Sequence, residues 1–339
     1  MPGFNGMKVF ALKVFLFFTP VLLIIIVMSY LIDPFKVFKD YTNYYKQGFV
    51  SLNRDMVCTR TYRKYRNTEK FNSFIFGSSR SLTYQLDDWK NHLSEDAKPF
   101  HYDASGEGIY GVCMKILYID ELGDTIKNAL IIADRDLLST VTNQKSHLLI
   151  SSPEISKESK INFYTTFIRA ELKVRFLMAY TDYSLFKKYR NYMSLLVFEI
   201  QYPSLYDSVN CNMIFGKEQE IALDSVNYIK KLIQEGVFYK RPKLITENYH
   251  ITETEILQLK TIKTIFDKHH TNYKIIISPL YDQVPLDLNQ LNLLYDVFGK
   301  NNVYNFSGKN EFTEPLTNFY EAQHYRSHVA RKIMNIIYN

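Results

Sequence analysis

A long uncharged segment near the N-terminus constrains this chain more than any other feature of its sequence. Residues 14–32 are nineteen consecutive positions without Asp, Glu, Lys or Arg. An α-helix rises about 1.5 Å per residue, so this segment covers nearly all of the roughly 30 Å hydrocarbon core of a bilayer. Lys8 and Lys13 precede the segment and Asp33 follows it. We predict a transmembrane anchor at residues 14–32, after a short N-terminal tail at residues 1–13.

The same segment could instead be a cleaved signal peptide or a buried helix of a soluble domain. A cleaved signal peptide has an apolar region of roughly 7 to 15 residues that ends at a cleavage site of small residues. Residues 24–32 run Ile-Ile-Ile-Val-Met-Ser-Tyr-Leu-Ile and offer no such site. A buried helix of a soluble domain rarely keeps every face apolar over this length. An uncleaved anchor is therefore favoured, with residues 14–32 in contact with the lipid bilayer.

The orientation of the anchor has to be argued from its flanks. Cytoplasmic flanks of membrane helices usually carry an excess of Lys and Arg. Here lysines lie on both sides: Lys8 and Lys13 before the segment, and Lys36, Lys39 and Lys46 after it. The lysine count does not decide the orientation of the anchor, but the short N-terminal tail favours an N-terminus in the cytoplasm. Residues 33 onward would then lie outside the cytoplasm.

After the anchor, short apolar runs alternate with longer segments of helical spacing. Runs with the length and composition of buried strands occupy residues 74–76, 129–133, 274–279 and 303–306. Helical spacing covers residues 110–122, 253–270 and 328–338. Such alternation is typical of βαβ units, whose strands form a parallel sheet. We predict an α/β fold, a three-layer α/β/α sandwich around a mostly parallel sheet.

The same patterns divide the chain beyond the anchor. Residues 33–70 are polar and aromatic and are predicted to form a juxtamembrane connector. Residues 71–339 form the α/β domain, and residues 140–250 interrupt its alternation with a mostly helical insertion. A hydrophobic fraction of 46% with 22% charged residues is normal for a globular protein and argues against disorder.

Charge and cysteine content exclude several classes of function. The net charge of +6 is dispersed, and its densest clusters, at residues 62–66 and 187–190, are better explained by solvated helix faces than by phosphate contacts. With a membrane segment present, we do not expect nucleic-acid binding. Cys58, Cys113 and Cys211 lack zinc-like spacing, and an odd number cannot pair completely. We expect no metal and no other cofactor.

The first candidate for chemistry is Gly77-Ser78-Ser79-Arg80, which follows the first predicted strand and opens a helical segment. Ligands of parallel α/β sheets bind beyond the carboxyl ends of the strands. A serine at such a turn exposes its hydroxyl beside backbone N–H groups that can hold an anion. The simpler alternative is a serine that caps the following helix.

The second candidate is Glu321-Ala322-Gln323-His324, just before the last predicted helix. A carboxylate three residues ahead of a histidine can orient the imidazole, which then serves as the base for a distant serine. The chain order serine, acid, histidine also occurs in known triads. Taken alone, the spacing is weak evidence, because a surface Glu-x-x-His pair is common.

Together, these two blocks resemble the SGNH/GDSL hydrolase-like superfamily over residues 71–339. The resemblance is to its membrane-anchored bacterial branch, in which the first block reads Gly-Ser-Ser-Arg instead of Gly-Asp-Ser-Leu. It implies that Ser79 is the nucleophile and that Glu321 and His324 complete the triad. The second block corresponds to Asp103-Ala104-Ser105-Gly106. The resemblance assigns Gly106, Ser78 and Arg80 to oxyanion or substrate binding.

The chain departs from the family pattern in two places. The third block of the family supplies an asparagine to the oxyanion hole, whereas this chain has Ala133-Asp134-Arg135-Asp136. Loss of one oxyanion donor costs about 10²- to 10³-fold in rate, and an aspartate would repel the oxyanion. Glu321 stands where the family has aspartate, and a displacement of about 1 Å can cost about 10²-fold.

The resemblance implies a membrane-anchored, extracytoplasmic acyl-ester enzyme of a bacterial cytoplasmic membrane. Its expected activity is that of an O-acetyltransferase or esterase acting on a cell-envelope polysaccharide or glycolipid. The alternative is a catalytically degenerate protein that binds glycan or assists a membrane acyltransferase. The two departures leave the choice between enzyme and binding protein open.

Overall fold

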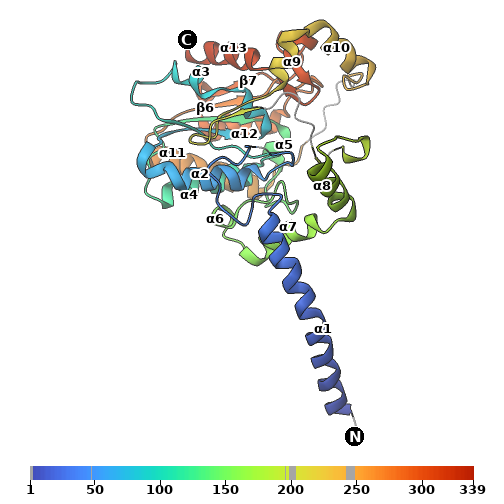
Figure 1. Ribbon diagram of the computed structural model, residues 1–339. Coiled ribbons are helices and arrows are strands. Elements are labelled where there is room, and N and C mark those ends of the chain that lie inside the picture. The colour runs from blue at the N-terminus through green and yellow to red at the C-terminus, as the bar shows by residue number, and fades with distance from the viewer. Residues whose placement is uncertain (1–2, 47, 195, 198–203, 242–248) are drawn as a thin grey trace. The chain divides into compact units, whose positions relative to one another are not determined.

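The computed structural model describes residues 3–46, 48–194, 196–197, 204–241 and 249–339. These residues belong to two compact units. The anchor unit comprises Met1–Leu52 and Ser159–Glu199, and the sheet unit comprises Asn53–Glu158 and Ile200–Asn339. Figure 1 shows the elements of both units.

The sheet unit contains a five-stranded sheet in the order β2-β1-β3-β6-β7, with every neighbouring pair parallel. The strands are β1 (Ser73–Gly77), β2 (Pro99–His101), β3 (Asn128–Ala133), β6 (Asn272–Ile277) and β7 (Val303–Asn305). The predicted α/β class and parallel sheet are therefore confirmed. Four of these strands coincide with the four predicted apolar runs, and β2 is an additional edge strand.

The strand order reverses between β1 and β3. From β1 the chain continues to β2 at the edge of the sheet, then returns to the other side of β1 as β3. In register, Gly77 at the end of β1 lies opposite Ile132 of β3. Open α/β sheets bind ligands beyond the carboxyl ends of their strands at such a reversal. The fold thus marks the ends of β1 and β3 as the place for a site.

Alternate strand residues enter two hydrophobic cores, one on each face of the sheet. Phe74 and Phe76 of β1 pack in one core with α2 (Arg54–Glu69), α4 (Ile109–Glu121), α11 (Glu253–Lys268) and α12 (Leu288–Phe298). Ile75, between them, packs in the other core with α3 (Leu86–Lys90) and α13 (Ser327–Tyr338). Figure 1 shows α13 on one side of the sheet and α4 and α11 on the other. The predicted three-layer α/β/α sandwich is confirmed.

Helix α2 shows how local sequence defines these elements. The side chain of Asn53 accepts a hydrogen bond from the Met56 N–H (2.8 Å) and so caps the first turn. At the other end, Lys70 adopts a left-handed conformation and its N–H bonds to the Arg66 carbonyl. Cys58 of α2 is completely buried in the first core.

Shorter elements complete the sheet unit. Its short helices are η1 (Ser79–Thr83), α5 (Arg135–Ser139), α6 (Pro153–Ser156), α9 (Lys217–Leu223), α10 (Ser225–Gln234), η3 (Lys300–Asn302) and η4 (Leu316–Asn318). Two antiparallel hairpins pair β4 (Leu205–Tyr206) with β5 (Met213–Ile214), and β8 (Phe319–Glu321) with β9 (His324–Tyr325). Of these elements, α6, β4, β5, α9 and α10 lie within residues 140–250, the range of the predicted insertion. Residues 195, 198–203 and 242–248 of that range lie outside the described part.

The anchor unit begins with α1 (Gly3–Ile32), followed along the chain by α7 (Lys160–Glu171), α8 (Val174–Phe186) and η2 (Asn191–Met193). Within α1, residues Met7–Ile32 are apolar and long enough to cross a membrane, and the most apolar part of this span is not buried. A signal anchor and a signal sequence both have such a helix. Asp33 ends it, because its carboxylate accepts hydrogen bonds from the Val37 N–H (2.7 Å) and the Tyr41 hydroxyl (3.0 Å).

Candidate active site

The turn after β1 carries the candidate nucleophile. Gly77 has φ +152°, and a Cβ there would lie 2.8 Å from the Ile132 carbonyl oxygen of β3, so only glycine fits this turn without strain. The chain then enters η1, where the Ser81 N–H and hydroxyl both donate to the Ser78 carbonyl (2.9 and 2.7 Å). This tight turn holds Ser79 at the carboxyl edge of the sheet.

The candidate acid and base lie on the β8–β9 hairpin. Glu321 and His324 are paired across this hairpin, next to a register shift between Phe319 and Glu321. Glu321 Oε2 accepts the Gln323 N–H (2.7 Å), and Glu321 Oε1 lies 2.5 Å from His324 Nδ1. The carboxylate therefore reaches the imidazole despite the extra methylene of glutamate, because the irregular hairpin brings the two side chains together.

The two blocks meet in space. Ser79 Oγ lies 2.8 Å from His324 Nε2, although the residues are 245 positions apart in the chain. With the Nδ1 proton directed at Glu321, Nε2 is free to accept the proton of the Ser79 hydroxyl. The arrangement has the geometry of a nucleophile, a general base and an orienting acid.

The charge of the acid is set by its surroundings. Burial by itself raises the pKa of Glu321, but the hydrogen bond and charge of His324, together with the charge of Lys217, lower this pKa to about 2. Lys217 Nζ lies 3.6 Å from Glu321 Oε1. Glu321 is thus a carboxylate at neutral pH, able to stabilise an imidazolium beside it.

A pocket of about 340 Å³ opens at this edge of the sheet. Its lining combines the candidate site with mostly polar neighbours: Ser78, Ser79, Arg80, Gly106, Glu107, Asp134, Asp136, Leu137, Thr140, Gln144, Gln323 and His324. All residues predicted for the site line this pocket except Glu321, which lies behind His324. Among the described residues, the buried hydroxyl of Ser78 has no hydrogen-bond partner.

Two backbone N–H groups are candidate oxyanion donors. Gly106 adopts a left-handed conformation (φ +56°), and its carbonyl oxygen accepts a hydrogen bond from Gln144 Nε2 (2.6 Å). This bond turns the Gly106 carbonyl toward Gln144. In the described chain, neither the Gly106 N–H nor the Ser79 N–H donates to another protein group. Both remain available to a bound oxyanion.

Asp134 directly follows β3 and stands where the family pattern resembled by the sequence has an asparagine. Its carboxylate caps α5 by accepting the N–H groups of Asp136 (2.9 Å) and Leu137 (3.0 Å). Its other oxygen pairs with Arg80 Nη1 at 2.7 Å. Arg80 Nε in turn donates to the Gln323 carbonyl in the β8–β9 turn (3.1 Å). The negative charge of Asp134 is therefore paired with a cation that also links η1 to the β8–β9 hairpin.

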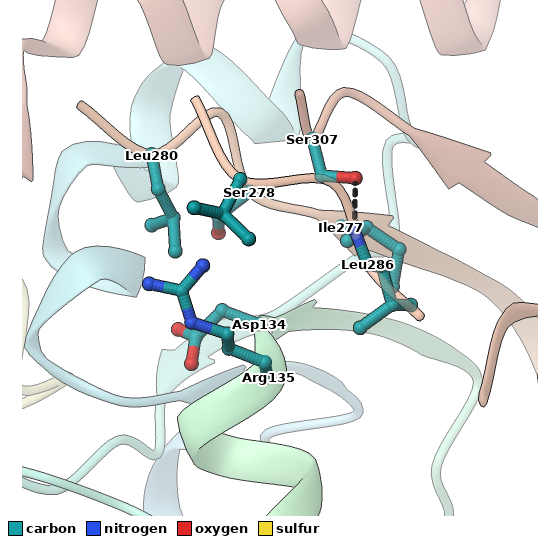
Figure 2. A pocket seen from close by; sticks show the side chains of 8 residues that line it. Asp134, Arg135, Ile277, Ser278, Leu280, Leu286 and Ser307 are labelled. Atoms are coloured by element: carbon teal, nitrogen blue, oxygen red, sulfur yellow. Dashed lines mark hydrogen bonds between the residues drawn. The ribbon is translucent and has the colours of Figure 1, made fainter. Parts of the chain in front are cut away.

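A second pocket lies at the ends of β3 and β6 (Figure 2), and its volume of about 10 Å³ has room for no more than one water. Arg135 pairs with Asp282, and the Leu286 N–H donates to the Ser307 hydroxyl (2.8 Å). This pocket is far smaller than the one at the β1–β3 reversal.

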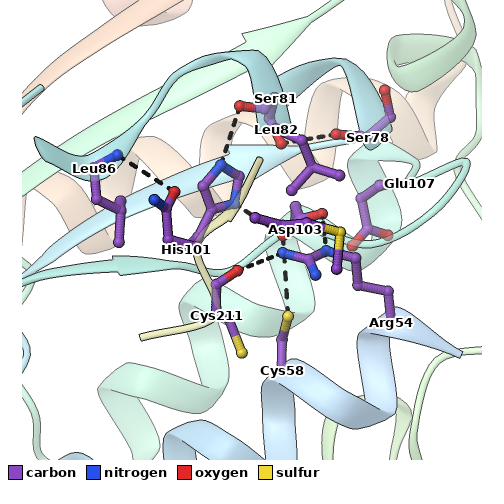
Figure 3. A network of polar contacts seen from close by, with 12 residues as sticks. Arg54, Cys58, Ser78, Ser81, Leu82, Leu86, His101, Asp103, Glu107 and Cys211 are labelled. Atoms are coloured by element: carbon purple, nitrogen blue, oxygen red, sulfur yellow. Dashed lines mark hydrogen bonds and ion pairs between the residues drawn. The ribbon is translucent and has the colours of Figure 1, made fainter. Parts of the chain in front are cut away.

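A buried polar network supports the second block (Figure 3). Asp103 is fully buried and pairs with Arg54 of α2 and with His101 Nδ1 (2.8 Å). Burial raises the pKa of Asp103, but the charge of Arg54 and the bond to His101 together lower it below its ordinary value. His101 Nε2 reaches the Ser81 carbonyl (3.0 Å), and Arg54 Nη2 donates to the Cys211 carbonyl (2.6 Å). The network links the turn after β1 to the start of the Gly106 loop.

A second buried group lies at the floor of the pocket. Lys115 is completely buried and pairs with Glu107 and with Asp55 (3.2 Å). Burial and the nearby charge of Asp55 raise the pKa of Glu107 to about 7, while Lys115 opposes this shift. A Cβ at Gly111 would lie 1.9 Å from the Glu107 carboxylate, so glycine leaves the room this group needs.

The segment before and within α9 contacts the acid–base pair directly. The ring of Phe215 lies 5.7 Å from that of His324, and Lys217 contacts Glu321. Both contacts come from the region predicted as an insertion. The local sequence pattern does not predict these contacts, because a Phe and a Lys in or next to a polar helix have many ordinary roles.

Further contacts from this segment hold the hairpin in place. Glu218 accepts a hydrogen bond from the Tyr320 hydroxyl (2.6 Å) and pairs with Arg326 (2.7 Å). The Tyr228 hydroxyl of α10 donates to the Tyr320 carbonyl (2.7 Å). Contacts from residues 215–228 therefore hold both ends of the β8–β9 hairpin in position.

Comparisons with protein-family models, with curated proteins and with solved structures found no match. Within the described residues, no group of three or more His, Cys, Asp and Glu side chains is placed to hold a metal ion. The chemistry of the site has to be argued from its own geometry, whose central feature is the Ser79–His324–Glu321 relay.

Proposed function

We propose that this protein is a serine-dependent acyl-ester enzyme of the SGNH type. The observation that carries the proposal is the relay at one rim of the sheet: Ser79 Oγ 2.8 Å from His324 Nε2, and His324 Nδ1 2.5 Å from Glu321. Both distances are within hydrogen-bond reach, which a nucleophile and its general base require.

In the proposed reaction, Ser79 Oγ attacks the acyl carbon while His324 Nε2 takes the hydroxyl proton. Glu321 stabilises the imidazolium, and the N–H groups of Ser79 and Gly106 stabilise the oxyanion. Collapse of the tetrahedral intermediate leaves the acyl group on Ser79, and His324 returns the proton to the departing alcohol. Water, in an esterase, or a hydroxyl of a second glycan, in a transferase, then takes the acyl group with His324 as base.

The pocket supports an ester of a polar alcohol. Its lining offers Arg80, Gln144 and Gln323 as polar contacts beside the nucleophile. A volume of about 340 Å³ accommodates an acetyl group together with a sugar ring. We therefore propose acetyl esters of a cell-envelope polysaccharide or glycolipid as substrates.

The apolar N-terminal helix supports a location at a membrane. We propose that α1 is an uncleaved signal anchor of a bacterial cytoplasmic membrane, with the sheet unit outside the cytoplasm. In that location the substrate is an envelope glycan, and a membrane-embedded acyltransferase is the partner that would supply acyl groups. Protease protection in inverted and right-side-out membrane vesicles tests the orientation.

A fluorophosphonate probe tests the proposed chemistry, because it labels a serine only when that serine is activated by its base. Wild-type protein should be labelled, and Ser79→Ala and His324→Ala should not. The matched control is Ser139→Ala, since Ser139 is an exposed serine at the end of α5. Intact-mass spectra of the four folded proteins give the result. Equal labelling of Ser79→Ala and wild type would remove Ser79 from the mechanism.

A second function is favoured by the Asp134 position. A carboxylate has no proton to donate to an oxyanion, and in the described part of the chain that of Asp134 is bonded to two N–H groups of α5 and to Arg80. A protein without a side-chain donor at this position could keep the fold but act as a glycan-binding or acyltransferase-assisting subunit. In that case Ser79→Ala would leave envelope O-acetylation unchanged, whereas the enzyme hypothesis predicts its loss.

A further inference from the structure

Helix α8 of the anchor unit is apolar on two opposite faces. Its inner face is packed, with Phe176 5% exposed and Ala179 fully buried. Its outer face is unusually apolar for a surface helix: Val174 is 71% exposed, Leu177 44%, Met178 59% and Leu185 70%. At 3.6 residues per turn, these four positions fall within an arc of about 100°. We call them the outer stripe.

The inner face of α8 is fixed against the chain that directly follows α1. The ring of Phe35 stacks on Phe176 at 4.9 Å, and the ring of Phe49 lies 5.2 Å from Tyr180 and 4.8 Å from Tyr183. Helix α7 contacts α1 as well, since the Glu171 carboxyl is hydrogen-bonded to Ser29. The outer stripe therefore belongs to a unit that is held at the end of the apolar helix.

The length of the connection places the first turn of α8 near the boundary of the hydrocarbon core. Phe35 is three residues beyond Ile32, the last residue of α1, and three residues span at most about 10 Å. The polar layer on each side of a bilayer is roughly 5–8 Å thick. With α1 across the membrane, the contact between Phe35 and Phe176 in the first turn of α8 thus lies in or next to that layer.

Charge around α8 complements a phosphate-rich surface. The segment 173–190 has five basic residues, Lys173, Arg175, Lys187, Lys188 and Arg190, and one acidic residue, Asp182, a net charge of +4. All five basic residues are exposed and flank the two ends of the helix, while Asp182 pairs with Arg190 (2.8 Å). Exposed cations close to an exposed apolar stripe favour binding to an anionic bilayer surface, because the stripe can enter the acyl chains while the cations contact lipid phosphates.

We propose that α8 is an interfacial helix that binds the bilayer surface, with the outer stripe and Phe186 among the upper acyl chains and the basic ends on lipid phosphates. Phe186 is 66% exposed and adds an aromatic ring at the end of the stripe. The anchor unit would then hold the membrane by two elements, α1 across it and α8 along it. The proposal depends on insertion of α1 but not on the proposed enzyme activity, since none of its residues lines the pocket.

Spin labelling of the full-length chain in nanodiscs tests the proposal. A label at Leu185→Cys is compared with one at Leu257→Cys, an equally accessible leucine (65% exposed) of α11 in the sheet unit. The three native cysteines are buried, and wild-type protein gives the background labelling. Discs of phosphatidylcholine, with and without phosphatidylglycerol, supply neutral and anionic surfaces. Collision rates with oxygen, which concentrates in lipid, and with a water-soluble nickel chelate report the surroundings of each label.

The expected result is a severalfold excess of oxygen over chelate collisions at position 185 and the reverse at position 257. Adding phosphatidylglycerol should increase the excess, and Lys187→Gln with Lys188→Gln should abolish that increase. A label at 185 as accessible to the chelate as the one at 257 overturns the proposal. A label at 185 shielded from both reagents also overturns it, because protein then covers the stripe. Met178→Cys provides a second site if Leu185→Cys does not fold.

Discussion

Glu321→Gln is the substitution that most sharply tests how the relay works. The amide has the shape of the carboxylate but only one oxygen. The Gln323 N–H, 2.7 Å from Glu321 Oε2, is a fixed donor that takes this oxygen. The amide NH₂ group then faces His324 Nδ1 and donates to it, which forces the imidazole proton onto Nε2. In this tautomer Nε2 points a proton at Ser79 and cannot accept one.

The loss of reaction rate caused by the wrong tautomer has a known magnitude. Replacing the carboxylate of a serine triad by the matching amide costs about 10⁴-fold in rate, which corresponds to about 5.4 kcal/mol of activation free energy at 1.36 kcal/mol per tenfold. Glu321→Asp keeps the charge and only withdraws the carboxylate by about 1 Å, so a loss of about 10²-fold is expected. The Glu321→Gln variant should therefore react about 10²-fold more slowly than the Glu321→Asp variant.

The assay is the second-order rate constant for fluorophosphonate labelling, followed by intact mass with Ser79→Ala as background. Glu314→Gln, the same substitution at an exposed site, serves as the control and should label at the wild-type rate. Matching thermal unfolding curves would show that the variants are folded. A Glu321→Gln rate within tenfold of wild type, or equal to that of Glu321→Asp, would refute the tautomer argument.

Three other substitutions probe the surroundings of the relay. Gly77→Ala should lower the free energy of unfolding in urea by about 1–3 kcal/mol, because φ +152° is strained for alanine and its Cβ would lie 2.8 Å from the Ile132 carbonyl. Lys217→Met should raise the pKa of Glu321. It should slow fluorophosphonate labelling by less than about fivefold, because a half-exposed ion pair contributes about 1 kcal/mol or less. The difference in labelling rate from wild type should shrink in high salt. Glu107 has a folded-state pKa of about 7 against about 4.3 when unfolded, so its contribution to stability is complete below about pH 4.3 and is lost as the pH rises through about 7. Glu107→Gln should therefore flatten the decline in unfolding free energy between about pH 5 and about pH 8, and an unchanged slope in urea titrations would contradict this assignment.

The elements of the sheet were predictable because each is a local pattern. The strands at residues 74–76 and 129–133 are short apolar runs buried on both faces, and helix 110–122 has helical spacing that ends at glycine. The serine and the acid–histidine blocks were likewise recognisable as short motifs. Their approach to 2.8 Å was only an expectation from chain order, since no local pattern specifies a contact over 245 positions.

The supports of the site were not predictable from the sequence. Arg54 was assigned to a connector, yet its guanidinium pairs with Asp103 inside the sheet unit. Lys217 and Glu218 were part of an undifferentiated helical insertion, yet they hold the hairpin of the acid and base. Each of these contacts joins polar residues far apart in the chain. Hydrophobic periodicity reports which face of an element is buried, but it carries no information on which polar groups meet there.

Arg80 resolves the apparent conflict at the third block. An aspartate at the end of β3 looked incompatible with an oxyanion because an unpaired negative charge beside the nucleophile would oppose charge development. Asp134 is almost fully buried, and its carboxylate is shared between the α5 N-terminus and a guanidinium. The charge is thus neutralised locally, and the same guanidinium binds the Gln323 carbonyl in the turn between Glu321 and His324. Arg80, which follows the two serines, therefore links the turn of Ser79 to the hairpin of Glu321 and His324. Asp134 has no proton to donate to an oxyanion, but through its pair with Arg80 it helps to position the residues of the candidate site.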